Sequence, residues 1–361
     1  MLQHLLPQTH PPVSQPQIGH GAPLTHLIAP SNVSPQLLVS IDELWELKLW
    51  HLRPDTDPVE YLSVTLTEEV LQAQWCQHTP GRLWCLNPQG HLGYYDFDLV
   101  KHQATFQAFA SLPPLSQEEP ESSHQAQILG FCQSPNHLFI LSSQGLWQTP
   151  FPDPTPTSVT ASPVTLNHLD GSPQTHWKQA ETLQAQITMT ANGLFLGLLS
   201  ARKAQVFHIV MTESASTGTC EPVFNCELET PATGDTAFLI APQGRFLAVD
   251  RHVYSLYRTP EPARKTTRHT YYGRPLAFFD QVSSPAQPCL LWASGDTLFT
   301  TALSEAGEIL RHQEMQYPER YASWPIFWSF AVADTRSEVP AFWVADHHRH
   351  NASTVIAPLL N

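Results

Sequence analysis

Charged side chains are scarce in this chain of 361 residues, and positive charge is scarcest. Asp, Glu, Lys and Arg together make up 14% of the residues, and 18 Lys and Arg stand against 32 Asp and Glu, a formal net charge of −14. Proteins that bind nucleic acid without sequence preference neutralise its phosphates with a surplus of Lys and Arg. The composition therefore excludes generic nucleic-acid binding, and we expect no nucleic-acid partner.

Long apolar runs and a secretion signal are also missing. No stretch approaches 18 uninterrupted apolar residues, so no membrane-spanning helix is expected. The first residues, MLQHLLPQTHPP, contain neither a basic segment nor a continuous apolar core, which argues against a signal peptide. The six cysteines lie mostly inside apolar runs, as buried and reduced thiols do. These features predict a cytoplasmic protein without a membrane partner.

The common catalytic motifs are absent as well. The sequence contains no G-x-S-x-G, no H-E-x-x-H, no phosphate-binding G-x-x-x-x-G-K and no calcium-binding loop. Ser200 and Lys203 match the S-x-x-K spacing, but the segment is predicted to be a turn between strands rather than the helix that this motif needs. We therefore predict no catalytic residue and no cofactor.

A repeated hairpin pattern is present instead. The stretch CLLWASGDTLFTTAL, residues 289–303, consists of two apolar runs joined by a short polar turn, which predicts a β-hairpin. The pattern occurs seven times, at intervals of 44 to 56 residues. The first strands of the seven hairpins contain Leu37, Leu83, Leu138, Leu194, Phe246, Leu290 and Phe342.

Further apolar runs precede most of these hairpins and follow several of them, so each unit holds about four short strands. Four strands in a unit of this length are typical of a propeller blade. The chain resembles a seven-bladed β-propeller of the WD-repeat-like kind, although it has no Trp-Asp dipeptide, kelch double glycine or Asp-box. The resemblance implies an all-β fold, a single domain over residues 1–361 with four-stranded antiparallel blades that start near residues 24, 70, 126, 183, 236, 275 and 324. A pair of β-sandwiches is the alternative.

Two structural expectations follow from a propeller. The N-terminal segment, residues 1–22, either closes the ring, with residues 1–6 as the outer strand of the seventh unit, or forms a free tail. The aromatic residues of the hairpins are expected in the apolar core between blades. They are Trp45, Trp84, Phe139, Phe195, Phe246, Trp292 and Phe342.

Basic residues are concentrated in one part of this acidic chain. Residues 245–274 hold seven of the 18 Lys and Arg, and four of them, Arg258, Arg264, Lys265 and Arg268, are expected in a loop and an outer strand. Arg is suited to bidentate contacts with carboxylates. The segment predicts a docking surface for a protein partner with an acidic surface, and the alternative is that it only balances the global charge.

The sequence gives only weak evidence for metal ligands. His347, His348 and His350 follow one another beside Asp346, but neighbouring residues of a strand point to opposite faces, and a solvated turn is the simpler interpretation. Cys220 and Cys226 do not have the spacing of a zinc knuckle or a redox pair. No metal site is therefore predicted.

Two functions remain open. The absence of catalytic motifs favours a non-catalytic scaffold that mediates protein–protein interaction. The alternative is a propeller enzyme, a hydrolase or a lyase, in which His and Asp residues of several blades converge on the central channel.

Overall fold

The computed structural model of the protein consists of β-strands joined by turns, and the described part of the chain contains no helix that could cross a membrane. The structure describes residues 19–29, 34, 36–52, 58–89, 91–111, 128–142, 145–150, 162–163, 165–168, 182–190, 193–212, 217–234, 236–256, 268–270, 273–281, 287–295, 297–304, 309–315, 330–334, 341–348 and 353–359.

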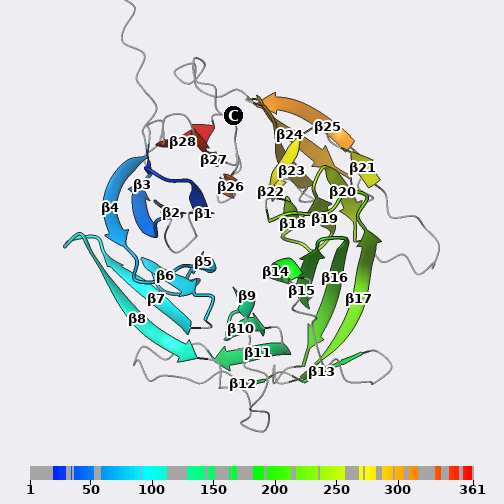
Figure 1. Ribbon diagram of the computed structural model, residues 1–361, viewed down its shortest axis with the longest axis horizontal. Coiled ribbons are helices and arrows are strands. Elements are labelled where there is room, and N and C mark those ends of the chain that lie inside the picture. Colours follow the sequence, from blue (N-terminus) through cyan, green and yellow to red (C-terminus); the bar gives the residue numbers. More distant parts are fainter. Residues whose placement is uncertain are drawn as a thin grey trace, which may run out of the picture.

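The strands form separate antiparallel sheets around a common centre, which makes the fold a β-propeller (Figure 1). In each sheet the strands follow one another outward in chain order, except that β13 (Thr165–His168) lies outside β17 (Thr217–Glu227) in blade four. Blades one to three contain β1 (Leu24–Ile28), β2 (Leu37–Asp42), β3 (Glu46–His51), β4 (Val59–Thr65), β5 (Gln72–Trp75), β6 (Arg82–Leu86), β7 (His91–Asp98), β8 (Gln103–Ser111), β9 (Ile128–Gln133), β10 (His137–Ser142), β11 (Gly145–Pro150) and β12 (Ser162–Pro163).

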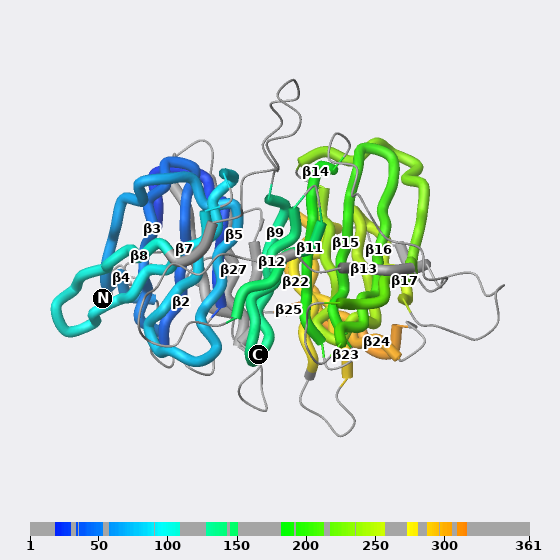
Figure 2. Tube along the Cα trace, turned by 90° about the horizontal axis from the view of Figure 1, so that it is seen from below, coloured from blue at the N-terminus to red at the C-terminus, as the bar shows by residue number. Residues whose placement is uncertain are grey.

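The second half of the chain continues the ring. Its strands are β13 (Thr165–His168), β14 (Thr182–Thr190), β15 (Gly193–Ser200), β16 (Lys203–Met211), β17 (Thr217–Glu227), β18 (Phe238–Ile240), β19 (Phe246–Val249), β20 (His252–Ser255), β21 (Arg268–Thr270), β22 (Arg274–Gln281), β23 (Gln287–Ser294), β24 (Thr297–Leu303), β25 (Ile309–Met315), β26 (Phe330–Asp334), β27 (Ala341–His348) and β28 (Ser353–Leu359). Seen from the side, the strands of blades one and four run between the two faces of the ring (Figure 2).

The number of blades differs from the prediction. Six blades have four or more strands, whereas β26, β27 and β28 form a three-stranded sheet between blade six and blade one. The expected seven four-stranded blades are therefore corrected to six. A repeated hairpin pattern predicts two strands of each unit and does not determine how many further strands pair beside them. The proposed closing strand, residues 1–6, lies outside the described residues, and the alternative of two β-sandwiches is wrong.

The connection between blades three and four supplies a short edge strand to each of them. β12 pairs with β11 at the edge of blade three, and β13 pairs in parallel with β17 at the edge of blade four. The hairpin of residues 289–303 has the predicted place, because β23 and β24 are the second and third strands of blade six.

Apolar side chains fill the space between neighbouring blades. In β2, Leu37, Val39 and Ile41 point to one face and pack with Trp75 and Leu83 of blade two. This alternation follows from the two-residue period of a strand. Similar clusters join blade two to three, three to four, four to five and five to six. Burial of these contacts supplies the main favourable free energy of the ring.

Five of the seven predicted core aromatics are buried. Trp84, Phe139, Phe195, Phe246 and Trp292 are between 0% and 8% exposed. Trp45 is 41% exposed, so its assignment to the core is wrong. By alternation Trp45 would share the buried face of Leu47 and Leu49, but its φ of +63° ends the extended backbone before β3 begins and turns the indole out of the blade. The side chain of Phe342 lies outside the described residues.

Candidate functional site

The face of blade one that points away from blade two is partly polar. Ser40 and Asp42 lie two residues apart on β2 and therefore share this face with Leu38. Trp50 of β3 pairs with Leu38, so its side chain lies diagonally across from Ser40. Leu24, Leu27 and Leu38 pack with Trp50 in a small apolar cluster beside these polar groups. The polar side chains are thus held in a dry environment.

Asp42 shapes the turn between β2 and β3. Its Oδ1 accepts the backbone N–H groups of Leu44 and Glu46 at 3.0 and 2.9 Å, and its own carbonyl accepts the N–H of Trp45 at 3.0 Å. Asp is favoured at such positions because its short carboxylate reaches the backbone a few residues ahead. The second oxygen, Oδ2, remains available for a side chain.

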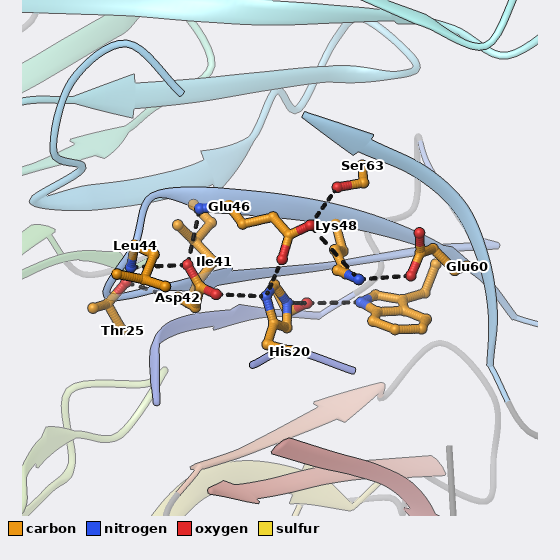
Figure 3. Close-up of polar contacts among 11 residues, drawn as sticks. His20, Thr25, Ile41, Asp42, Leu44, Glu46, Lys48, Glu60 and Ser63 are labelled. Carbon is orange, nitrogen blue, oxygen red and sulfur yellow. Dashed lines mark hydrogen bonds and ion pairs between the residues drawn. The ribbon is translucent and has the colours of Figure 1, made fainter. Parts of the chain in front are cut away.

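His20, which precedes β1, takes that place and completes a chain of hydrogen bonds (Figure 3). Its Nδ1 lies 3.1 Å from Asp42 Oδ2, and its Nε2 lies 2.6 Å from Ser40 Oγ. Ser40 Oγ also accepts the indole N–H of Trp50 at 2.7 Å. We call His20, Ser40, Asp42 and Trp50 the His20 network.

The protons of the network have one consistent arrangement. Because a carboxylate only accepts, Nδ1–H of His20 donates to Asp42, and Nε2 accepts the hydroxyl proton of Ser40. Ser40 in turn accepts from Trp50, so every polar group is satisfied with a neutral imidazole. Burial lowers the pKa of His20 below its ordinary value of 6.5 and outweighs the opposing influence of Asp42.

Charged residues continue from the network toward the surface. Glu46 Oε2 lies 3.6 Å from His20 Nδ1, and Glu46 Oε1 accepts the hydroxyl of Ser63 at 2.7 Å. The ammonium of Lys48 lies 3.7 Å from Glu46 and donates to Glu60 at 2.8 Å. These contacts link β3 to β4 and connect the buried network to the outer part of blade one.

The order Ser40–His20–Asp42 is that of a nucleophile, a base and an orienting carboxylate in hydrolases, at distances within hydrogen-bond reach. The burial of these three residues argues against catalysis here, because a substrate cannot reach them. Ser40 is 0% exposed and His20 and Asp42 are 1% exposed, so no substrate carbonyl can approach the hydroxyl. The Ser40 oxygen is also occupied by the Trp50 N–H. The network therefore acts as a buried structural connection.

His20, Asp42 and Glu46 also offer three ligand atoms within 4.8 Å of one another, which makes them a candidate metal centre. The distance of 3.1 Å between Nδ1 and Asp42 Oδ2 is that of a direct N–H···O bond, which needs the proton that a metal would displace. Lys48 already places a positive charge beside Glu46. The donor set fits a hydrogen-bonded network better than a metal ion.

The strand β1 of blade one lies beside the last sheet of the ring. β1 contacts both β26 and β27, so the polar face of blade one is turned toward the three-stranded sheet (Figure 3). The junctions from blade one through to blade six are packed with apolar clusters. Directional hydrogen bonds fix the position of His20 and the chain before β1 more narrowly than apolar packing does.

Two surface pockets lie elsewhere. One of about 270 Å³ between blades one and two is lined mainly by apolar atoms, with His51, Tyr61 and Leu99 among its residues. The other, of about 210 Å³, lies between blades four and five and includes Glu227, Glu229 and Asp250. Neither contains a member of the His20 network, so the buried Ser40 hydroxyl opens into neither pocket.

The predicted site residues are only partly within the described chain. Arg268 begins β21, the outer strand of blade five, opposite Tyr254, whereas Arg258, Arg264 and Lys265 lie outside the described residues. His347 and His348 are the last two residues of β27 and pair with Thr354 and Ser353, so they belong to a strand rather than to the expected turn. His350 lies outside the described residues. Cys220 and Cys226 are both free thiols of β17.

Sequence reasoning missed the His20 network. The spacing of Ser40, Asp42 and Trp50 on one hairpin shows that their side chains share a face, which is a local signal. His20 gives no such signal, because it lies 20 residues before Ser40 in a segment expected to be a closing strand or a tail. Only the fold brings its imidazole to the hairpin.

Acidification should reduce stability. Burial lowers the pKa values of both His20 and His26, whereas the unfolded chain titrates near 6.5. As the pH falls below 6.5 the unfolded state gains protons that the folded state excludes, so the free energy of unfolding falls between about pH 7 and pH 5. Urea unfolding at pH 7.5, 6.5 and 5.5 measures the slope of the free energy of unfolding against pH. A His20→Gln/His26→Gln variant should show a smaller slope, and the exposed His91→Gln should not. Equal slopes in all three proteins would contradict the assignment.

The comparisons with known proteins identify no relative. No protein-family model matches the chain, and no curated protein matches it significantly.

Proposed function

We propose that the protein is a non-catalytic β-propeller scaffold of the WD-repeat-like kind that mediates protein–protein interaction. The observation that carries the proposal is the burial of the Ser40–His20–Asp42 arrangement. These residues have the order of a catalytic group, but they are at most 1% exposed and are saturated by hydrogen bonds within the protein. A rigid ring offers binding surfaces on its two faces.

The proposed partner surface includes the basic segment. Arg258, Arg264, Lys265 and Arg268 concentrate positive charge in a chain of net charge −14, which suits a partner with an acidic surface. A docking surface has to be exposed, and exposed charges contribute little to folding, about 0–1 kcal/mol each, so the proposal predicts that these residues can be replaced without loss of the fold. Their contribution to association should fall with salt, because mobile ions screen exposed charges.

Replacement of these four residues by Gln should weaken partner binding and leave the melting temperature nearly unchanged. The wild-type chain is used to isolate partners from an extract of its host, and the partner identified by mass spectrometry is then titrated with both proteins at 50 and 300 mM salt. We expect slower association of the variant, with a difference that shrinks at high salt.

A matched control carries the same change of charge outside residues 245–274, as Lys101→Gln, Arg202→Gln, Lys203→Gln and Arg311→Gln. Equal binding by wild type and the first variant would show that the basic segment is not the docking surface. Failure of the wild-type chain to bind any partner would count against a scaffold.

The alternative of a propeller enzyme has its own test. The purified chain is assayed with ester, peptide and glycoside substrates for hydrolysis and with uronate polymers for lyase cleavage. The scaffold proposal predicts no turnover above buffer. Turnover that follows the chain through two chromatographic steps would overturn it.

A further inference from the structure

The turn between β2 and β3 carries two exposed apolar side chains, Leu44 and Trp45. Leu44 is 70% and Trp45 is 41% exposed, whereas five other hairpin aromatics are buried. Large apolar side chains that are adjacent and exposed mark interaction sites more often than scattered ones do. Trp is also the residue type most enriched among side chains that dominate binding energy in interfaces.

The fold does not need Trp at this position. The backbone of Trp45 has φ +63°, and the corresponding turn of blade six has Gly295 with the same φ of +63°. A left-handed backbone suits Gly and costs about 1 kcal/mol or more for a bulky L-residue. A Trp side chain at position 45 therefore makes the left-handed backbone of the turn less favourable, and its indole is only partly buried.

The tip is held rigidly in this conformation. Asp42 accepts the N–H groups of Leu44, Trp45 and Glu46, the N–H of Glu43 donates to the carbonyl of Pro23, and the carbonyl of Trp45 accepts the N–H of Leu66 at 2.8 Å. A prearranged surface loses little conformational entropy on binding. The His20 network below the turn fixes Asp42 itself.

Three exposed carboxylates lie on the same face of the ring as the two apolar side chains. Glu43 precedes Leu44, and the connection that begins at Leu66 continues into Glu68 and Glu69, all three of them exposed. Glu68 contacts Asn87 and His91 of blade two, which places it on the same face of the ring as the β2–β3 turn. Within the part of the chain that the structure describes, Glu43 and Glu69 form no ion pair with Lys or Arg.

We propose that this surface, defined as Glu43, Leu44, Trp45, Glu68 and Glu69, docks a basic segment of a protein partner that alternates Arg or Lys with apolar residues. The carboxylates attract the cations, the indole accepts an Arg guanidinium over its face, and Leu44 covers an apolar side chain. The inference rests on the proposed scaffold function and names a second surface, opposite in charge to the basic segment.

The test uses three fluorescein-labelled 12-residue peptides and the full chain. The first alternates Arg and Leu, the second replaces Arg by Glu, and the third replaces Leu by Ser. Fluorescence anisotropy at 50 and 300 mM salt gives the Kd values. We expect the Arg/Leu peptide to bind most tightly, with weaker binding at high salt, and the Glu/Leu peptide not to bind.

Trp45→Gly is the decisive variant, because Gly suits the φ of +63° and keeps the turn folded. It should raise the Kd of the Arg/Leu peptide about tenfold or more, as expected for loss of a dominant aromatic contact. Glu68→Gln/Glu69→Gln should raise it about threefold and reduce its salt dependence. Val100→Ser is the control, because Val100 is 90% exposed in the β7–β8 turn at the opposite end of blade two.

Equal Kd values for wild type and Trp45→Gly, or equal binding of the Glu/Leu peptide, would overturn the inference. A wild-type dimer that becomes a monomer in Trp45→Gly, measured by analytical ultracentrifugation, would assign the surface to a second copy of the chain and overturn the basic partner. The two proposals fail separately. A partner retained equally by wild type and Trp45→Gly overturns only this surface, whereas the absence of any partner overturns the scaffold.

Discussion

Asp42→Ala should destabilise the protein by about 3–5 kcal/mol, because it leaves three buried or half-buried donors without an acceptor. These donors are the backbone N–H groups of Leu44 and Glu46 and the Nδ1–H of His20. Loss of the carboxylate also releases His20 from its orientation toward Ser40. Urea unfolding followed by tryptophan fluorescence measures the change.

The Asp42→Asn variant distinguishes the contribution of the turn hydrogen bonds to stability from that of the contact with His20. The amide oxygen can still accept both backbone N–H groups, but the amide nitrogen is a donor and faces the Nδ1–H of His20. A smaller loss of about 1–2 kcal/mol is expected, because only the contact with His20 has to rearrange. The exposed neighbour Glu43→Ala should change stability by no more than about 0.5 kcal/mol. Equal losses for Asp42→Ala and Glu43→Ala would show that the hydrogen bonds of Asp42 do not stabilise the fold.

Trp84→Ala should destabilise the protein by about 3–5 kcal/mol, because it removes a fully buried aromatic side chain and leaves a cavity. Trp84 is 0% exposed on β6 and packs with Phe131 and Ile140 between blades two and three. Its ring meets Tyr94 edge-on at a centroid distance of 5.0 Å. The melting temperature should fall by about 4–7 °C in a chain of this size.

Two variants control this result. Trp84→Phe keeps an aromatic ring against Tyr94 and should lose roughly half as much stability. Trp45→Gly removes an equally large side chain from an exposed position and should leave the melting temperature unchanged or raise it, because it also relieves the left-handed backbone. A larger loss in Trp45→Gly than in Trp84→Ala would contradict the assignment of core and surface.

Much of the propeller could be predicted because its information is local. A strand needs a run of apolar residues, and a hairpin needs turn residues between two such runs, as in residues 289–303. The repetition of this pattern predicted an all-β ring and excluded long helices. The same local reasoning placed Trp84 and Phe246 in the core, because both lie in the middle of apolar strands.

The number of complete blades and the exposure of the Trp45 side chain could not be predicted without the tertiary structure. Among the described residues the last sheet has three strands, and a local hairpin pattern does not determine how many strands pair beside it. Trp45 continues the alternation of Leu47 and Leu49, so its pattern predicts burial. One left-handed residue at the turn reverses the direction of its side chain.

The sequence by itself determined where the strands of this protein lie and which of their faces are apolar, since strand formation depends on neighbours one and two residues away. The tertiary structure decided what its polar residues do. His20, Ser40 and Asp42 have the chemistry of a catalytic group, and only the packed ring shows that they are enclosed and hydrogen-bonded to one another. The physical reason is that burial and hydrogen-bond partners depend on segments brought together by folding, and these properties decide whether a hydroxyl meets substrate or supports a turn.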